Sequence, residues 1–215
     1  MDEITRDVDV LGRVPSLQTQ HLLATKSIVH RINHLLRNIP GGELSIFAEV
    51  AAKYDASVLA TVRRITRQPE IPSLARRITQ LPLREGGLGY PLWSSTADTA
   101  FLAAYTNAAE TFPLLFPDRP YLWKCVPHPS KIKMAESLST YASFAARALV
   151  RIESKAPGIS KLLEPSSTPG EGTRNSRGLQ HSMSAYINEF EANDVLSAVK
   201  ASDCPSHPWR AALFN

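Results

Sequence analysis

The chain has 215 residues, of which 43% are hydrophobic and 20% are charged, and its net charge is +4 at pH 7. This much apolar material is enough for a packed core and excludes a wholly disordered chain. The mild positive charge permits an acidic partner such as a nucleic acid, but it does not require one.

The cysteines and the lengths of the apolar runs indicate the cellular compartment of the protein. The two cysteines, Cys125 and Cys204, are far apart and lack the CxxC spacing of redox or zinc sites, which fits a reducing environment. The charged beginning of the sequence has no apolar core of a signal peptide. No apolar run approaches the roughly 20 residues that span a bilayer. The sequence therefore predicts an intracellular protein, nuclear or cytoplasmic, without a membrane partner.

The sequence predicts six helices after a polar lead-in. Residues 1–15 are mixed in character and are expected to be extended. Beyond them, apolar residues recur at steps of three, four and seven, the pattern of amphipathic helices. Ser16 is expected to cap the first helix and Ser73 the third. Counted in chain order, the predicted helices span about residues 17–38, 43–67, 73–81, 95–112, 130–154 and 176–201.

The predicted fold class is all-α, with a bundle-like helical domain, because no segment shows the sustained alternation of a β-strand. That domain is expected to cover residues 16–163. Residues 164–178 are rich in Pro, Ser and Gly, which is typical of a flexible linker. Residues 179–215 are predicted to form a C-terminal helix and a tail.

Three glycines lie within four positions, at Gly86, Gly87 and Gly89. Glycine is favoured where the backbone needs a positive φ or must approach another group closely. The segment lacks the Gly-Lys-Ser/Thr ending of a phosphate loop, and it also fails the spacing of a dinucleotide fingerprint. It is therefore predicted to be a structural turn that orients the helix over 95–112 against the two helices before it.

The chemistry-bearing residues do not converge on an active site. His30 and His34 share a helix face at a spacing that can hold a metal ion, but Arg31 stands where a zinc hydrolase needs Glu, and no third ligand is evident. A pair of partly exposed histidines is the favoured interpretation, and a metal-dependent hydrolase is a remote alternative. No nucleophile-elbow pattern occurs. The sequence thus predicts no catalytic residue, no metal and no cofactor.

A run of arginines is the main candidate for binding. Between residues 63 and 84 only Glu70 offsets them. If the helices fold back on each other, the guanidinium groups form a patch suited to phosphate oxygens, with salt-dependent and sequence-independent binding. An ordinary solvated face is the alternative, since cations also complement a helix C-terminus. The six arginines are Arg63, Arg64, Arg67, Arg76, Arg77 and Arg84.

Three segments in order resemble a known family. Residues 81–89 read Leu-Pro-Leu-Arg-Glu-Gly-Gly-Leu-Gly, and Ala-Phe-Leu-Ala-Ala follows at 100–104. Upstream, residues 31–40 and the helix from Phe47 to Asp55 also match. The phrase Leu-Pro-x-Arg-x-Gly-Gly-Leu-Gly and its neighbours resemble the region downstream of the polymerase core in non-LTR retrotransposon reverse transcriptases. That family most often has Asp at the position of Asp55.

The resemblance implies a thumb-like helical segment that grips a nucleic-acid duplex through its phosphates. It covers about residues 17–110 and is weaker over 174–215. The Tyr-x-Asp-Asp motif of the polymerase palm, whose carboxylates bind two metal ions, is absent from the sequence. The implied protein is a non-catalytic, truncated remnant with weak binding to RNA or DNA. The competing hypothesis is a helical protein–protein interaction module that uses its apolar helix faces and has no nucleic-acid role.

Overall fold

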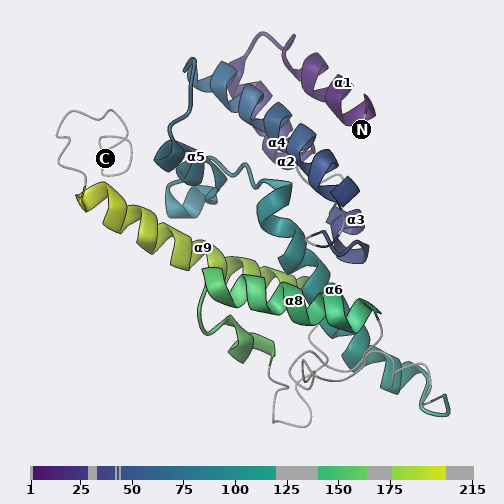
Figure 1. The fold of residues 1–215 in the computed structure, drawn as a ribbon. Helices are drawn as coiled ribbons and strands as arrows, with labels where there is room; N and C mark the ends of the chain where they lie inside the picture. The colour runs from purple at the N-terminus through teal and green to yellow at the C-terminus, as the bar shows by residue number, and fades with distance from the viewer. Residues whose placement is uncertain are drawn as a thin grey trace. The chain divides into compact units, whose positions relative to one another are not determined.

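A computed structural model of the protein describes residues 2–28, 33–41, 43, 45–119, 140–163 and 176–201. Within these residues every regular element is a helix and none is a strand, so the predicted all-α, multi-helix fold is confirmed (Figure 1). The elements are α1 (Asp2–Leu11), α2 (Leu17–Lys26), α3 (Asn33–Asn38), α4 (Ser45–Thr66), α5 (Ser73–Gln80), the short 3-10 helix η2 (Leu83–Glu85), α6 (Trp93–Leu115), α8 (Thr140–Lys155), the 3-10 helix η4 (Ile159–Leu163) and α9 (Ser176–Ala201).

The chain folds as two compact units. Unit 1 comprises Met1–Arg31, Glu49–Trp93 and Asn188–Asn215, and unit 2 comprises Ile32–Ala48 and Ser94–Ile187. The predicted helical domain over 16–163 therefore has residues in both units. Of the predicted linker over 164–178, the first twelve residues lie outside the described part, and the last three lie in α9.

The expected extended lead-in over residues 1–15 is wrong, because Asp2–Leu11 form a helix. Val8 and Leu11, three residues apart, lie on one face and are buried. This face packs α1 against α2, and burial of a small apolar stripe stabilises a helix that its polar composition alone would not. The helix is only ten residues long and most of its residues are polar, so the apolar spacing was too short to be recognised in the sequence.

The helix predicted over 17–38 is interrupted. Its beginning is as expected, since the Ser16 hydroxyl accepts a hydrogen bond from the Thr19 N–H at 3.3 Å. However, α2 ends at Lys26, where Ser27 closes the last turn by donating its N–H to the Leu23 carbonyl. A new helix, α3, begins at Asn33. Apolar spacing of three and four continues through the break, so periodicity alone does not reveal it.

The other predicted helices agree closely with the structure. Helix α4 matches the prediction within two residues at each end, and α9 begins and ends where predicted. Ser73 is not a cap, because Pro72 occupies that position and no side chain caps α5. Helix α6 continues through Pro113 to Leu115 instead of ending before the proline. Of the helix predicted over 130–154, residues 140–154 are helical in α8, and 130–139 lie outside the described residues.

A buried aromatic pair and a carboxylate organise the core of unit 1. Tyr54 of α4 stacks on Trp93 with ring centroids 3.7 Å apart, and both side chains are almost completely buried. The neighbouring carboxylate, Asp55, is also buried, and its Oδ1 accepts a hydrogen bond from the Trp93 N–H at 2.8 Å. A helix N-terminus has N–H groups without partners in the helix, so Asp55 satisfies one of them from another helix.

The glycine-rich segment forms a tight turn in which each glycine has its own reason. Gly86 and Gly89 have φ of 77° and 72°, in the left-handed region that favours glycine. Gly87 is required for a steric reason, because a Cβ there would lie 2.0 Å from the Leu81 carbonyl oxygen. Two hydrogen bonds close the turn, from the Gly89 N–H to Leu81 and from the Tyr90 N–H to the Thr79 carbonyl.

The turn buries Tyr90 against α2. The Tyr90 hydroxyl and His21 Nδ1 are 3.0 Å apart, and the two rings meet edge to face. Burial raises the pKa of Tyr90 to about 12, against the opposing charge of Arg64. The turn is hydrogen-bonded to the end of α5, Tyr90 contacts α2, and Trp93 just beyond the turn stacks on α4. The turn therefore connects three helices of unit 1.

Unit 2 has its own core, in which small residues allow close packing. Helix α8 contributes three buried alanines, α6 contributes Phe101 and Leu102, and the first half of α9 contributes Leu179 and Met183. Alanine side chains let helix backbones approach, so larger residues such as Met183 fill the remaining space. The three alanines are Ala142, Ala145 and Ala148.

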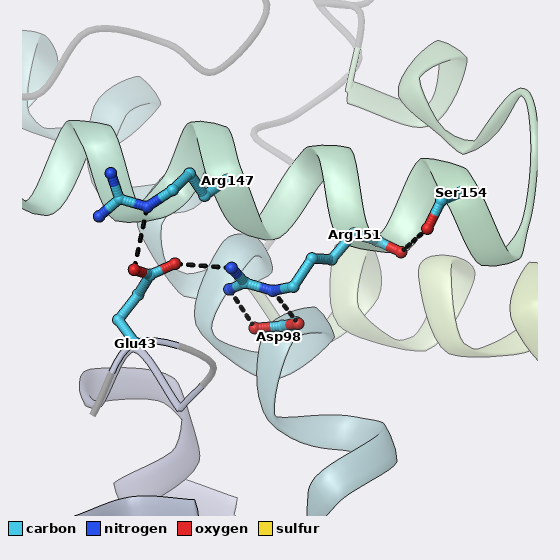
Figure 2. A network of polar contacts seen from close by, with 5 residues as sticks. All are labelled: Glu43, Asp98, Arg147, Arg151 and Ser154. Carbon is cyan, nitrogen blue, oxygen red and sulfur yellow. Dashed lines mark hydrogen bonds and ion pairs between the residues drawn. The ribbon is translucent and has the colours of Figure 1, made fainter. Parts of the chain in front are cut away.

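A network of charged side chains joins three segments of unit 2 (Figure 2). Arg151 of α8 donates two hydrogen bonds of 2.8 Å to Asp98 of α6 and one of 2.6 Å to Glu43, which precedes α4. Arg147, one turn earlier, donates to the other oxygen of Glu43 at 2.9 Å. Partial burial raises the pKa of Glu43, but the two arginines outweigh it, so the net pKa is below the ordinary value of 4.5.

A second carboxylate in unit 2 caps a turn. Glu153 accepts hydrogen bonds from the backbone N–H groups of Gly158 at 2.7 Å and Ser160 at 3.0 Å. The bond from Gly158 is the main reason that the pKa of Glu153 is lowered, and burial opposes it only partly. A carboxylate at the N-terminal side of η4 also complements the partial positive charge of its free amides.

We expect the two backbone conformations in the glycine turn to respond differently to alanine. Gly87→Ala places Cβ against a carbonyl and should lower the free energy of unfolding by about 3 kcal/mol. Gly89→Ala has open space, with the nearest atom 3.9 Å away, and should cost only the left-handed penalty of about 1 kcal/mol. Urea denaturation followed by circular dichroism measures both. Equal losses would contradict the steric role of Gly87.

The carboxylate of Glu153 should make stability depend on pH. Because its pKa is lowered in the folded state, its contribution is complete above 4.5 and is lost as the pH falls through the lowered value. Glu153→Gln should therefore destabilise the protein at pH 7, and the difference in stability from the wild type should shrink as the pH falls below 4.5. Denaturation curves measured from pH 7 downward test this prediction, and Glu49→Gln, which removes an exposed carboxylate, is the control. A difference in unfolding free energy between Glu153→Gln and the wild type that stays constant with pH would refute the prediction.

Candidate nucleic-acid interface

The six candidate arginines all belong to unit 1, on two helices and one 3-10 turn. Arg63 and Arg64 lie in the last turn of α4, and Arg67 directly follows that helix. Arg76 and Arg77 lie on α5, and Arg84 lies in η2. Five of them are exposed, and Arg77 is half-buried. The structure therefore presents two clusters, one at the end of α4 and one on α5, with Arg84 beside the glycine turn.

The end of α4 places an arginine in a costly conformation. The Gln68 N–H donates to the Arg63 carbonyl, and the Arg67 N–H donates to the Arg64 carbonyl, which together form a Schellman motif. The position that closes this motif is left-handed, and Arg67 holds it with φ of 55°. Glycine is the usual residue there, because any Cβ is penalised in this region.

Arg64 also contacts the N-terminal segment. Its guanidinium lies against the backbone of Gly12, since a Cβ on that glycine would be 2.2 Å from Arg64 Nη1. The same charge acts on Tyr90, where it lowers a pKa that burial raises. Arg64 is thus partly structural, whereas exposed Arg63 and Arg67 project from the same helix end.

Arg77 and Arg84 are engaged with carboxylates. Arg77 donates from Nε to Glu191 and from Nη2 to Asp194, both on α9. The hydrogen bond to Glu191, followed by the one to Asp194, raises the pKa of Arg77 further above its already high value. Arg84 pairs with its neighbour Glu85 at 3.2 Å. Four exposed candidates have no such ion pair to another described residue, namely Arg63, Arg64, Arg67 and Arg76. Of these, Arg64 is the one that contacts Gly12.

The partners of Arg77 were missed by sequence reasoning. Glu191 and Asp194 are three residues apart on a helix, so they share a face, and this spacing was the one available signal. They lie more than 110 residues beyond Arg77 in the sequence, and pattern alone cannot assign such a pair. The candidate interface is consequently narrower than the six-arginine patch that the sequence predicted.

Other predicted or alternative sites fall outside this surface. His30 and the side chain of His34 lie outside the described residues. Within the described part, no group of three or more His, Cys, Asp or Glu side chains is placed to hold a metal ion. Among the described helices none has both the length and the apolar character needed to cross a membrane.

Comparison with known proteins returned no match to a family model, a curated protein or a solved structure.

We expect Arg67→Gly to stabilise the end of α4 although it removes a charge. Glycine adopts the left-handed conformation without the Cβ penalty, whereas Arg67→Ala retains that penalty. Arg67→Gly should exceed Arg67→Ala in stability by about 1 kcal/mol. Thermal and urea denaturation of the two charge-matched variants test this directly. If alanine proved as stable as glycine, the left-handed assignment at this residue would be wrong.

Proposed function

We propose that this chain is a non-catalytic helical segment, related to the region C-terminal to the polymerase core of non-LTR retrotransposon reverse transcriptases. We propose further that it binds nucleic-acid backbones weakly and without sequence preference. The support for its origin is the order of the three resembling segments along the sequence, and the non-catalytic assignment follows from the missing Tyr-x-Asp-Asp motif. The proposed function accordingly includes no nucleotidyl transfer.

The observation that carries the binding proposal is the arginine at the end of α4. Cations in a last helical turn have a structural reason of their own, because they complement the helix dipole. That reason covers Arg63 and Arg64, but it does not explain why Arg67 holds a position that glycine fills at lower cost. A strained residue at a surface motivates a functional hypothesis, and here the strained residue carries a charge outward.

The chemistry of these side chains suits phosphate oxygens. Each guanidinium presents a planar fork of donors that stays charged at any physiological pH. Arginine contacts to phosphate oxygens position a protein on a duplex and supply no sequence information. The small number of exposed arginines implies weak affinity with a shallow dependence on salt.

Replacing the three exposed candidate arginines that neither pair with a carboxylate of the described residues nor contact Gly12 should weaken binding at low salt. The variant carries Arg63→Gln, Arg67→Gln and Arg76→Gln, and fluorescence anisotropy with labelled 20-base-pair RNA and DNA duplexes measures its affinity. The control carries Arg119→Gln, Lys155→Gln and Lys161→Gln, which removes three equally exposed charges from unit 2. We expect at least about a tenfold loss for the first variant and little change for the control.

Two outcomes would overturn this proposal. If the wild type binds neither duplex at low salt, the arginines do not form an interface. If both triple variants weaken binding equally, net charge and not this surface is responsible. Circular dichroism of each variant shows whether the helices are retained.

A protein-interaction module remains the second candidate, and one observation favours it. The C-terminal end of α6 exposes Leu114 and Leu115 by more than 60%, and Phe116 beside them is also exposed. Large apolar side chains side by side at a helix end are a feature of binding surfaces. A wild-type protein that fails the duplex titration but associates through these residues would fit this module.

A further inference from the structure

The C-terminal helix is held in two different ways along its length. In unit 2, Leu179 and Met183 belong to a large buried cluster built with α6 and α8. In unit 1, the buried cluster that includes α9 is smaller. Val195 and Val199 pack with Ile78 of α5 in a small cluster. Because hydrophobic stabilisation scales with buried apolar area, the second half of α9 is attached to α5 more weakly than the first half is attached to its own core.

The charged contact beside that small cluster involves one of the candidate arginines. On α5, Arg76 faces solvent, whereas the next residue, Arg77, faces α9 and binds both Glu191 and Asp194. Successive residues on a helix point about 100° apart, so the acidic face of α9 covers one arginine of the pair and leaves the other free. Glu191 and Asp194 therefore occupy the donors that a phosphate would otherwise take.

We propose that the second half of α9 is an autoinhibitory element of the arginine surface. Its carboxylates hold Arg77 away from nucleic acid and place negative charge beside Arg76. This inference rests on the proposed nucleic-acid function and adds its regulation. Release of α9 from α5 frees the Arg77 fork for a phosphate and removes two repelling charges at the same time.

The energetics suit a reversible contact. The side chains of Arg77, Glu191 and Asp194 are 33%, 38% and 61% exposed, and ion pairs at such exposure contribute little to stability because water and salt screen them. A phosphate can compete for a guanidinium held in this way. A rise in salt weakens both the internal pair and the external one, so the contact regulates binding most strongly at low ionic strength.

Neutralising the two carboxylates tests the proposal. Glu191→Gln with Asp194→Asn keeps the side-chain shapes and should tighten binding to a 20-base-pair DNA duplex by roughly threefold or more at low salt. It should also steepen the slope of log K against log salt by about 0.9, the value for one added phosphate contact. The matched control is Glu49→Gln with Glu189→Gln, which removes two exposed carboxylates from unit 1 and should change affinity less.

Adding Arg77→Gln identifies the residue responsible. In the wild type this change should leave affinity within about twofold, because Arg77 is already occupied, and in the Glu191→Gln, Asp194→Asn background it should abolish the gain. The autoinhibition is refuted if the wild type binds the duplex but Glu191→Gln with Asp194→Asn does not raise its affinity. It is also refuted if the Glu49→Gln, Glu189→Gln control raises the affinity equally. Either result leaves the proposed nucleic-acid binding intact. Absence of binding by the wild type and the double variant alike overturns both.

Discussion

The start of α6 depends on one buried carboxylate. Asp55 lies on α4, is almost inaccessible to solvent, and accepts the Trp93 amide at 2.8 Å. A hydrogen bond to a charged group contributes about 2 kcal/mol, and leaving a buried amide unpaired costs a similar amount. Tyr54, the residue before Asp55, stacks on the indole of Trp93, so α4 and Trp93 are joined by a ring contact as well. These contacts fix α4 to Trp93, the first residue of α6, which follows the glycine turn.

This constraint determines how the arginines are presented. The turn is bound to α5 through Leu81 and Thr79, and to α2 through the contact of Tyr90 with His21. Trp93 then binds it to α4. Apolar residues of α4 and α5 such as Tyr54, Val58 and Ile78 are buried. The arginines Arg63, Arg67 and Arg76 remain exposed. The basic surface is in this sense a consequence of the packing of unit 1, and its function depends on what the exposed charges meet.

Local signals in the sequence predicted local structure well and long-range contacts poorly. The cap at Ser16, the bounds of α9 and the body of α4 follow from apolar period and from residues such as Pro and Gly at the ends. Helix α1 was missed because tertiary burial of Val8 and Leu11 stabilises it. The break after Lys26 was missed because the apolar period runs through it.

The candidate site shows the same division. Composition located every arginine, and secondary-structure prediction placed most of them on the correct helix. Neither indicated that Arg77 would be engaged by α9, or that Arg67 would close α4 in a left-handed conformation. The engagement of Arg77 depends on partners more than 110 residues away, and the conformation of Arg67 depends on how the chain leaves α4. Both are determined by the folded chain and not by the local sequence.

Among the described residues, Arg77 and Arg151 each bind two carboxylates, and their surroundings give these contacts different roles. Arg151 meets Glu43 and Asp98, whose side chains are only 14% and 16% exposed. Removing that arginine would take its two hydrogen bonds from the largely buried Asp98 and would leave Glu43 with Arg147 as its remaining arginine partner. Taking one partner from a buried ion pair is strongly destabilising, so the network in Figure 2 is part of what holds unit 2 together. The carboxylates that meet Arg77 are open to water and can regain their hydration when the pair separates. Separation is therefore inexpensive at Arg77 and expensive at Arg151, and of the two only the contact on α5 is suited to exchange its internal partner for an external phosphate.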